Sequence, residues 1–279
     1  MPEQLLAYFE KDGNMFVPKP YARNPWTPTG LHGRLCAGLI ARAVEMEFGS
    51  PDFHFSRFTT DLFRMAPLAP VEVRTRLVRD GNRIRVADGV VLADGKEVAR
   101  ASAVMLRKGT NPDGEVWRLP NWDVPAPEDV PSPKTAEAQG RVGGDPIRET
   151  RPINPVTDRL VQKRQWIRDH GQLVAGEDIS PFVRIAMAAD ITNPFGNTGL
   201  QRLAFVNADV TSYLFRYPEG EWLGFEVANH GSADGVAVAS CNLYDVKGPM
   251  GTSIVCAVAD NRVREGTNAP GAAGAVRTP

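Results

Sequence analysis

The chain has 279 residues, a formal net charge of -1 and 42% hydrophobic residues, so it is long enough for two modest domains or one fused core. The near-zero charge gives no electrostatic reason to expect binding to nucleic acid or to an anionic membrane. No apolar run approaches the roughly 18 residues of a transmembrane helix. The start of the chain, Met1–Gln4, carries an acidic residue and no basic-then-apolar signal pattern, which predicts a cytoplasmic protein.

Familiar metal and nucleophile motifs are missing from the sequence. There is no His-Glu-x-x-His, no paired Cys-x-x-Cys and no glycine-rich phosphate loop, so we expect no metal and no cofactor. The absence of Gly-x-Ser-x-Gly argues against an esterase with a serine nucleophile. The three cysteines each lie in an apolar run, which favours small buried side chains over reactive thiols: Cys36, Cys241 and Cys256.

The first half of the chain predicts one helix followed by antiparallel strands. Apolar residues recur at helical spacing through 31–48, which is typical of a long and largely buried helix. After the break at 49–51, residues 71–77 alternate between apolar and polar side chains, as a strand with one buried face does. The segment 79–82 turns the chain, and Asp94-Gly95 closes a later hairpin.

The second half predicts the same order. Ser180 is a plausible N-cap, Pro181 fits the first helical position, and the helix is expected to end at Asn193-Pro194. Four strand candidates follow it: 203–216, 222–230, 236–244 and 252–259. Between the halves, 112–155 holds nine prolines, which cannot lie in central strands or helix interiors, so we interpret it as a connector.

The two halves also repeat each other in sequence. Asp61-Leu-Phe-Arg64, followed by Pro67, recurs as Tyr213-Leu-Phe-Arg216, followed by Pro218, and Leu62 precedes Leu214 by 152 positions. One repeat of this length predicts a duplicated domain rather than a solenoid. The predicted divisions are an N-terminal unit, a proline-rich connector, a C-terminal unit and a flexible tail: 1–110, 111–160, 161–263 and 264–279.

A helix wrapped by an antiparallel sheet, present twice, resembles a double hotdog. The order of motifs over 20–262, apart from the connector, resembles that of the acyl-CoA thioesterase II family. These motifs are Leu31-His-Gly33, 57–67, Val78–Asn82, Ala188-Ala-Asp190, Asn207-Ala-Asp209, 216–222 and Leu243-Tyr-Asp245. The resemblance implies an α+β fold in which each of two tandem units has a long helix packed on an antiparallel sheet.

The resemblance also implies hydrolysis of acyl-CoA thioesters without a metal or cofactor. Family members use an Asp on the second helix, a Ser or Thr, and a Gln that positions water. The Asp matches Asp190, the hydroxyl position falls on Asn207, and the Gln position falls near Val255. The Asn207 amide can still orient a water molecule, but the Val255 side chain can make no hydrogen bond, so we expect an altered active site.

The chemistry of the reaction assigns roles to particular residues. Thioester hydrolysis needs a base for the attacking water and donors for the developing oxyanion. Asp190 is the candidate base, assisted by Asn207. The backbone N–H groups of Gly33 and Arg34 are candidate oxyanion donors, because unpaired donors and the positive helix end converge at the start of the first helix.

Three further side chains are candidate substrate contacts. His32 precedes the flexible Gly33 and could face the substrate, although a loop histidine bonded to backbone would look the same. Asn193 could replace a missing polar group, or simply cap a helix end. Arg79 could meet a CoA phosphate, or belong to the solvated face of a strand.

Three functions stay open from the sequence, and hydrolysis of acyl-CoA thioesters with an altered site is the one we favour. The alternative is a non-hydrolytic protein that binds acyl-CoA or an acyl carrier, which the loss at Val255 would fit. A hydratase or dehydratase would need an Asp-His pair, which His32 and Asp190 supply only within hydrogen-bond reach. Acyl length is open, and so is assembly into a homo-oligomer through exposed sheet edges.

Overall fold

The first half folds as its sequence predicts, into one helix and a run of antiparallel strands. The computed structural model describes residues 5–25, 27–132, 147–154, 161–199 and 203–260, so the tail predicted at 264–279 lies outside the described residues. The elements are α1 (Gly33–Phe48), β3 (Phe53–Leu62), β4 (Val71–Asp80), β5 (Ile84–Ala93) and β6 (Lys96–Arg107). The hairpin between β5 and β6 turns at Asp94 and Gly95, whose φ angles of 49° and 71° suit a two-residue turn.

The strands of the second half follow the prediction except in their first segment. The stretch expected as one strand over 203–216 is interrupted at Ala208, and the short piece before the break pairs only with the last strand. The piece after the break pairs on both sides. The strands are β10 (Phe205–Asn207), β11 (Asp209–Leu214), β12 (Leu223–Ala233), β13 (Val236–Asp245) and β14 (Gly248–Ala259).

The helix of the second half is shorter than predicted. Helix α3 covers only Pro181–Ala188, a 3-10 turn follows at Ala189–Ile191, and a further short helix α4 covers Thr192–Asn197. The prediction of a long helix in each unit is therefore wrong for this half. Pro194 does not end the helical segment, because it lies in the first turn of α4, where a missing N–H costs no intrahelical hydrogen bond.

Several elements had no clear signal in the sequence. They extend the sheet at both edges, and one of them, together with a 3-10 turn, falls inside the proline-rich stretch. Trp122 of that stretch stacks on Tyr244 with ring centroids 4.6 Å apart, so part of the stretch packs against the sheet. The elements are β1 (Ala7–Asp12), β2 (Met15–Pro18), β7 (Arg148–Pro152), β8 (Arg164–Asp169), β9 (Gln172–Val174) and the 3-10 turns Pro20–Ala22 and Pro127–Asp129.

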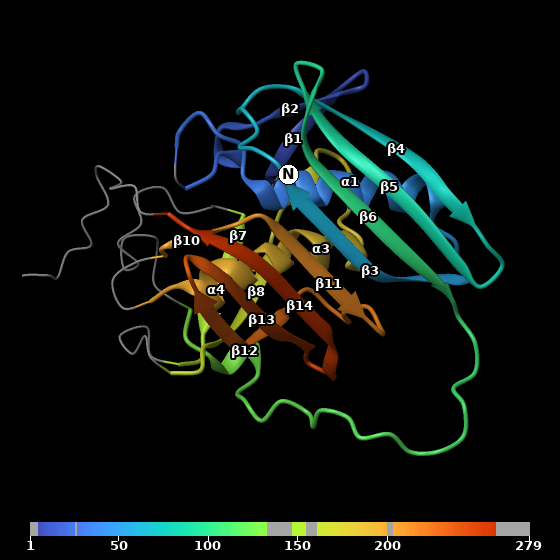
Figure 1. Cartoon of the computed structure of the whole chain (residues 1–279), viewed down its shortest axis with the longest axis vertical. Coiled ribbons are helices and arrows are strands. Elements are labelled where there is room, and N and C mark those ends of the chain that lie inside the picture. The colour runs from blue at the N-terminus through green and yellow to red at the C-terminus, as the bar shows by residue number, and fades with distance from the viewer. Residues whose placement is uncertain (1–4, 26, 133–146, 155–160, 200–202, 261–279) are drawn as a thin grey trace, which may run out of the picture.

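The strands form one sheet in which the second half mirrors the first (Figure 1). The order β12-β13-β14-β11 continues as β3-β6-β5-β4, and the halves join where β11 pairs antiparallel with β3. Thr59 lies opposite Thr211, the residue 152 positions later, and their hydroxyl oxygens are 3.0 Å apart. Equivalent positions that pair with each other are what a twofold axis between two repeats produces.

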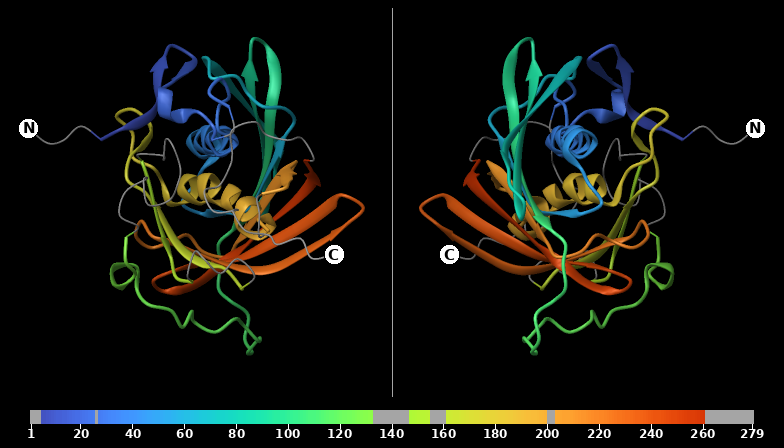
Figure 2. Two further views of the ribbon diagram at one scale, coloured as in Figure 1. Left: turned by 90° about the vertical axis from the view of Figure 1, so that its left-hand side faces the viewer. Right: turned by 90° about the vertical axis from the view of Figure 1, so that its right-hand side faces the viewer.

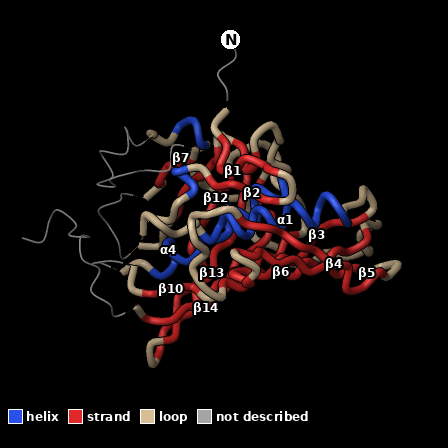
Figure 3. The backbone as a smooth tube through the Cα atoms, turned by 90° about the horizontal axis from the view of Figure 1, so that it is seen from above, coloured by secondary structure: helices blue, strands red, loops and turns tan. Residues whose placement is uncertain are grey.

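The sheet curves around α1 and α3, which lie side by side at the centre (Figures 2 and 3). The helices run antiparallel, because Glu45 near the end of α1 contacts Ser180 before α3, and His32 before α1 faces Asp190 after α3. At the crossing, a Cβ on Gly38 would come within 2.6 Å of a Met187 side-chain carbon, so glycine is needed there. No helix in the described ranges is long and apolar enough to cross a membrane.

Candidate active site

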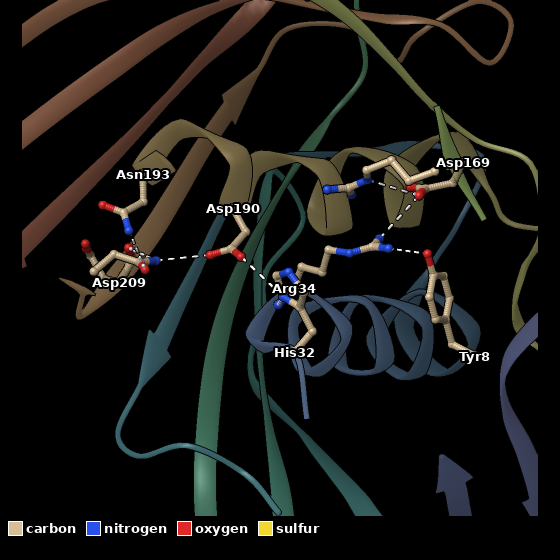
Figure 4. A network of polar contacts seen from close by, with 9 residues as sticks. Tyr8, His32, Arg34, Asp169, Asp190, Asn193 and Asp209 are labelled. Carbon is tan, nitrogen blue, oxygen red and sulfur yellow. Dashed lines mark hydrogen bonds and ion pairs between the residues drawn. The ribbon is translucent and has the colours of Figure 1, made fainter. Parts of the chain in front are cut away.

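Asp190 lies in the 3-10 turn that follows α3, where it faces the beginning of α1 (Figure 4). One carboxylate oxygen accepts a hydrogen bond from the Asn207 amide at 3.1 Å, and the other lies 3.7 Å from Nδ1 of His32. The side chain is 15% exposed, so part of it is open to solvent. Burial raises the pKa of Asp190 above the usual value of a carboxyl group, and the Asn207 hydrogen bond only partly offsets this.

His32 is the N-cap of α1, and its ring is neutral. Nδ1 accepts a hydrogen bond from the Arg34 backbone N–H at 3.4 Å, which requires the tautomer with the proton on Nε2. Burial, reinforced by the positive charges of Arg34 and Arg148, holds the pKa of His32 well below its usual value. The 3.7 Å contact with Asp190 is therefore not an ion pair at neutral pH, and it exceeds hydrogen-bond length.

Of the two backbone donors predicted at this helix end, one is free. The N–H of Gly33 stands at the first position of α1 and donates to no acceptor within the described part of the chain. The N–H of Arg34 is occupied by His32. The Gly33 position is also tight, since an added Cβ would lie 3.2 Å from a methyl carbon of Leu62. The helix end thus presents one donor toward the neighbourhood of Asp190.

The Arg34 side chain does not lie where a substrate could reach it. It is 1% exposed, donates to the Tyr8 hydroxyl, and lies 3.4 Å from Asp169, which also binds Arg148 at 3.2 Å (Figure 4). Burial alone would raise the pKa of Asp169, but the Arg148 and Arg34 guanidinium groups hold it below its usual value. This network ties the first turn of α1 to β1, β7 and β8.

Asn207 and Asn193 are engaged with protein groups rather than presented to a ligand. The Asn207 amide donates to Asp190 and to the Asp209 carbonyl at 3.3 Å, and its oxygen accepts from the Asn193 amide at 3.1 Å. Asn193 is 4% exposed and donates also to the Phe205 carbonyl. With both amide hydrogens in use, Asn207 orients Asp190 rather than donating to a water molecule.

Val255 is predicted to stand where the family has a Gln, and its surroundings in the structure are apolar too. Val255 is 1% exposed and packs in a cluster with Ala189 and Val210, next to the turn that carries Asp190. Two nearby hydroxyl groups, which the sequence did not single out, are no substitute. Thr192 and Ser253 are fully buried, and their oxygens lie 2.5 Å from each other.

Arg79 lies away from this cluster. It stands near the end of β4, four residues beyond Thr75, which contacts Glu47 in the last turn of α1. A helix with the 16 residues of α1 is about 24 Å long, so Arg79 and Gly33 lie near opposite ends of it. Over the described residues, no group of three or more His, Cys, Asp or Glu side chains is placed to hold a metal ion.

Two protein-family models match the chain in tandem. The acyl-CoA thioesterase N-terminal domain matches residues 22–106, and the acyl-CoA thioesterase C-terminal domain matches residues 122–254. A search of curated proteins found no match. The boundary between the two matches falls in the proline-rich stretch.

Solved structures share the architecture over nearly the whole chain. A hot dog fold protein of Alicyclobacillus acidocaldarius is 20% identical, with a TM-score of 0.68, over 91% of this chain and 96% of its own. The tesB protein of Mycobacterium avium subsp. paratuberculosis is 16% identical, with a TM-score of 0.65, over 90% and 95%. An acyl-CoA thioesterase II of Mycobacterium marinum is 13% identical, with a TM-score of 0.60, over 89% and 94%. This α+β chain has the hotdog fold and belongs to the acyl-CoA thioesterase II-like family.

Proposed function

We propose that the chain hydrolyses acyl-CoA thioesters between Asp190 and the first turn of α1. The observation that carries the proposal is the juxtaposition of a partly exposed carboxylate with a helix end whose first N–H, on Gly33, has no acceptor among the described residues. A carboxylate whose pKa is raised by burial is a stronger base than one in water. A free N–H at a helix N-terminus favours a developing negative charge.

The reaction follows from these two groups and water. Asp190 takes a proton from a water molecule while the water oxygen bonds to the thioester carbonyl carbon. The carbonyl oxygen becomes negatively charged and accepts a hydrogen bond from Gly33 N–H. As the tetrahedral intermediate collapses, the carbon–sulfur bond breaks, and Asp190 returns its proton to the leaving CoA sulfur. The products are a carboxylic acid and CoA, with one water consumed.

Asn207 and His32 support the base in this scheme. The Asn207 hydrogen bond fixes one oxygen of Asp190, so the second oxygen is the one that faces the attacking water. His32 cannot serve as the acid, because its lowered pKa keeps the ring neutral. It holds the first turn of α1 through the Arg34 backbone, and its Nε2–H is left to contact the substrate.

The proposal also covers the division into domains, the location of the protein and its assembly. The two halves form two hotdog units in tandem, divided near 1–110 and 161–263, and the protein acts in the cytoplasm on soluble acyl-CoA. The terminal strand β7, whose residues are partly exposed, offers a sheet edge for assembly into a homo-oligomer. The acyl chain length follows from none of these features.

The His32–Asp190 contact supports hydration of an enoyl thioester as a second candidate. The two side chains lie 3.7 Å apart, and a small shift would let them form a hydrogen bond once a proton lies on the carboxyl group or on Nδ1. In that reaction, water would add across a carbon–carbon double bond, and the loss of enoyl-CoA absorbance would report it. Hydrolysis is favoured because both tandem family models are acyl-CoA thioesterase domains.

The test is release of CoA thiol from a panel of short, medium and long acyl-CoA thioesters. Replacing the base, as in Asp190→Asn, should lower kcat about 1,000-fold, because general-base catalysis contributes factors of this order. The matched control is Glu45→Gln, since Glu45 is a half-buried carboxylate at the other end of the helix pair. Saturable acyl-CoA binding without turnover by the wild type would instead identify an acyl-CoA binding protein.

A further inference from the structure

A row of amide side chains leads from Asp190 to the surface on the side away from His32. The Asn193 amide, which donates to Asn207, has its own oxygen accepting from the Asn197 amide at 2.9 Å. The oxygen of Asn197 lies 2.8 Å from Nδ1 of His230, an exposed residue of β12. Asn193 and Asn197 are 4% and 3% exposed, so the middle of this row is sealed from solvent.

Every hydrogen bond in the row points the same way. An ionised Asp190 can only accept, so Asn207 must present its NH2 group to it. Asn193 must present its NH2 group to Asn207, because that group also donates to the Phe205 carbonyl. The direction at each asparagine then requires the amide oxygen to accept from the residue behind it.

This direction fixes the histidine at the outer end. Since the Asn197 amide group donates to Asn193, its oxygen must accept from His230, which therefore carries a proton on Nδ1. The His230 ring is further held by an edge contact with Phe205, with ring centroids 6.1 Å apart. His230 is thus the donor that completes the row, and Asp190 is the acceptor that ends it.

We propose that Asn193, Asn197 and His230 are positioning residues that hold the Asn207 amide in the one orientation that donates to Asp190. This deepens the proposed function and rests on it, since the residue that is positioned is the proposed base. If the row is cut at Asn197, Asn193 keeps only its bonds to the Phe205 carbonyl and to Asn207. Displacement of Asn193 then leaves Asn207 held by the Asp209 carbonyl and Asp190 alone, and its amide can turn its oxygen toward the carboxylate. Two facing oxygens would repel, so the base would be displaced and harder to ionise.

The first test cuts the row at its sealed middle. Asn197→Leu should lower kcat about 10-fold with little change in KM, the cost of one misplaced hydrogen bond to a charged group. The acid limb of the kcat/KM profile should move to higher pH, because Asp190 loses the donor that favours its ionised form. A loss of stability without a change in this limb would reduce Asn197 to a structural residue and overturn the proposal.

The second test exchanges the outer donor. His230→Phe should lower kcat about 3-fold, whereas His230→Asn, whose amide N–H can take the place of Nδ1–H, should recover most of that loss. The matched control is His54→Phe, because His54 makes one hydrogen bond within the described residues, to the Leu214 carbonyl at 3.1 Å, and has a tilted ring contact with Tyr217. Equal losses in all three variants would contradict a specific donor at position 230.

A third measurement does not depend on activity. The ¹⁵N shifts of the His230 ring, recorded at alkaline pH where they no longer change, should show the Nδ1–H tautomer in the wild type and lose that preference in Asn197→Leu. An Nε2–H tautomer in the wild type would show that the hydrogen bonds of the row do not point as proposed. If the wild type turns over no thioester, the proposed function fails by itself, and the ring spectra still decide whether the row exists.

Discussion

The N-terminal ends of α1 and α3 are equivalent places in the two halves, yet only the α1 end offers groups that can act on a substrate. His32 caps α1 and Gly33 begins it, whereas Ser180 caps α3 and Pro181 begins it. Gly33 presents a backbone N–H at the first helical position, and proline has none. The duplicated frame thus supplies two helix ends, and the first residue of each helix decides whether that position offers an N–H.

The carboxylates that face the two helix ends also differ in their hydrogen bonds. At the α1 end, Asp190 has one oxygen without a hydrogen bond to the described residues. At the α3 end, Glu45 accepts from the Ser180 hydroxyl, and Arg42 is held by Glu177. These groups line a small hollow at the surface, in which Arg42 and Glu177 bind each other and Glu45 is bound to the Ser180 cap itself. The comparison indicates that an active helix end needs an N–H at its first position and a carboxylate that is not bound to the cap.

The largest effect expected outside catalysis concerns how the two helix ends are anchored. Asp169→Ala at the α1 end should cost about 3–5 kcal/mol of unfolding free energy, because it leaves Arg34 and Arg148 charged and without this carboxylate in the interior. Urea unfolding at pH 7 measures the loss. The lowered pKa of Asp169 gives the pH dependence its sign: this stability is present above the usual carboxyl pKa and is lost as pH falls through the depressed value.

The matched control is Glu177→Ala at the α3 end. It removes a pair with Arg42 in which Glu177 is 36% exposed, so the expected loss is below about 1 kcal/mol. Similar losses at both ends would show that burial does not distinguish the two anchors, and the contrast drawn between them would be wrong.

The next largest effect is expected when the first residue of α1 is replaced by proline, the first residue of α3. Gly33→Pro removes the free N–H while keeping a residue suited to the first helical position, and His32 already has the extended backbone that precedes proline. The expected result is a kcat about 100-fold lower, as for the loss of one oxyanion donor, measured by CoA thiol release.

Two controls separate the lost donor from steric effects at this position. Gly33→Ala keeps the N–H but presses on Leu62, so it should cost much less than proline if the donor is what matters. Pro181→Gly adds an N–H at the first position of α3, but it should create no second active end, because the carboxylate there, Glu45, is bound to the Ser180 hydroxyl. Equal losses in the alanine and proline variants would assign the effect to crowding.

More of the fold than of the candidate site could be predicted from the sequence. The four-residue apolar spacing over 31–48 and the Asp94-Gly95 turn are local signals, and the structure confirms both elements. The second helix was predicted too long, because an apolar run does not reveal that Ala189–Ile191 tightens into a 3-10 turn. Strand β9 was missed, since its pairing with β1 joins segments more than 150 residues apart.

At the site, Asp190 lies near the start of α1, where the candidate oxyanion donors are, but the partners of each residue were not foreseen. The Arg34 backbone N–H was predicted to bind the substrate oxyanion, whereas it bonds to His32, and the Arg34 side chain turns inward to a carboxylate 135 residues away. Asn193 and Asn197 have the four-residue spacing of neighbours on a helix, a signal that could have linked them. That Asn193 reaches Asn207 depends on β10 pairing with β14, which no local pattern encodes.

The smallest expected effect is a gain in stability when the base is removed. Burial raises the pKa of Asp190, so the native state favours the protonated carboxyl, and the stability linked to protonation is full below the usual pKa of about 3.9 and lost as pH rises through the raised value. Asp190→Asn should therefore be more stable than the wild type by about 1 kcal/mol at pH 7, with a smaller gain in acid.

The charges around Asp190 bear on the size of this gain but leave its sign unchanged. The titratable or charged groups that act on it electrostatically are His32, Arg34 and Cys36 from α1 and Arg148 from β7, and the arginines oppose burial without overcoming it. Urea unfolding of both proteins from pH 4 to 8 measures the gap, which should widen with pH. A variant that is both inactive and less stable at pH 7 would mean that Asp190 holds the turn together, and its catalytic role would then need evidence other than loss of activity.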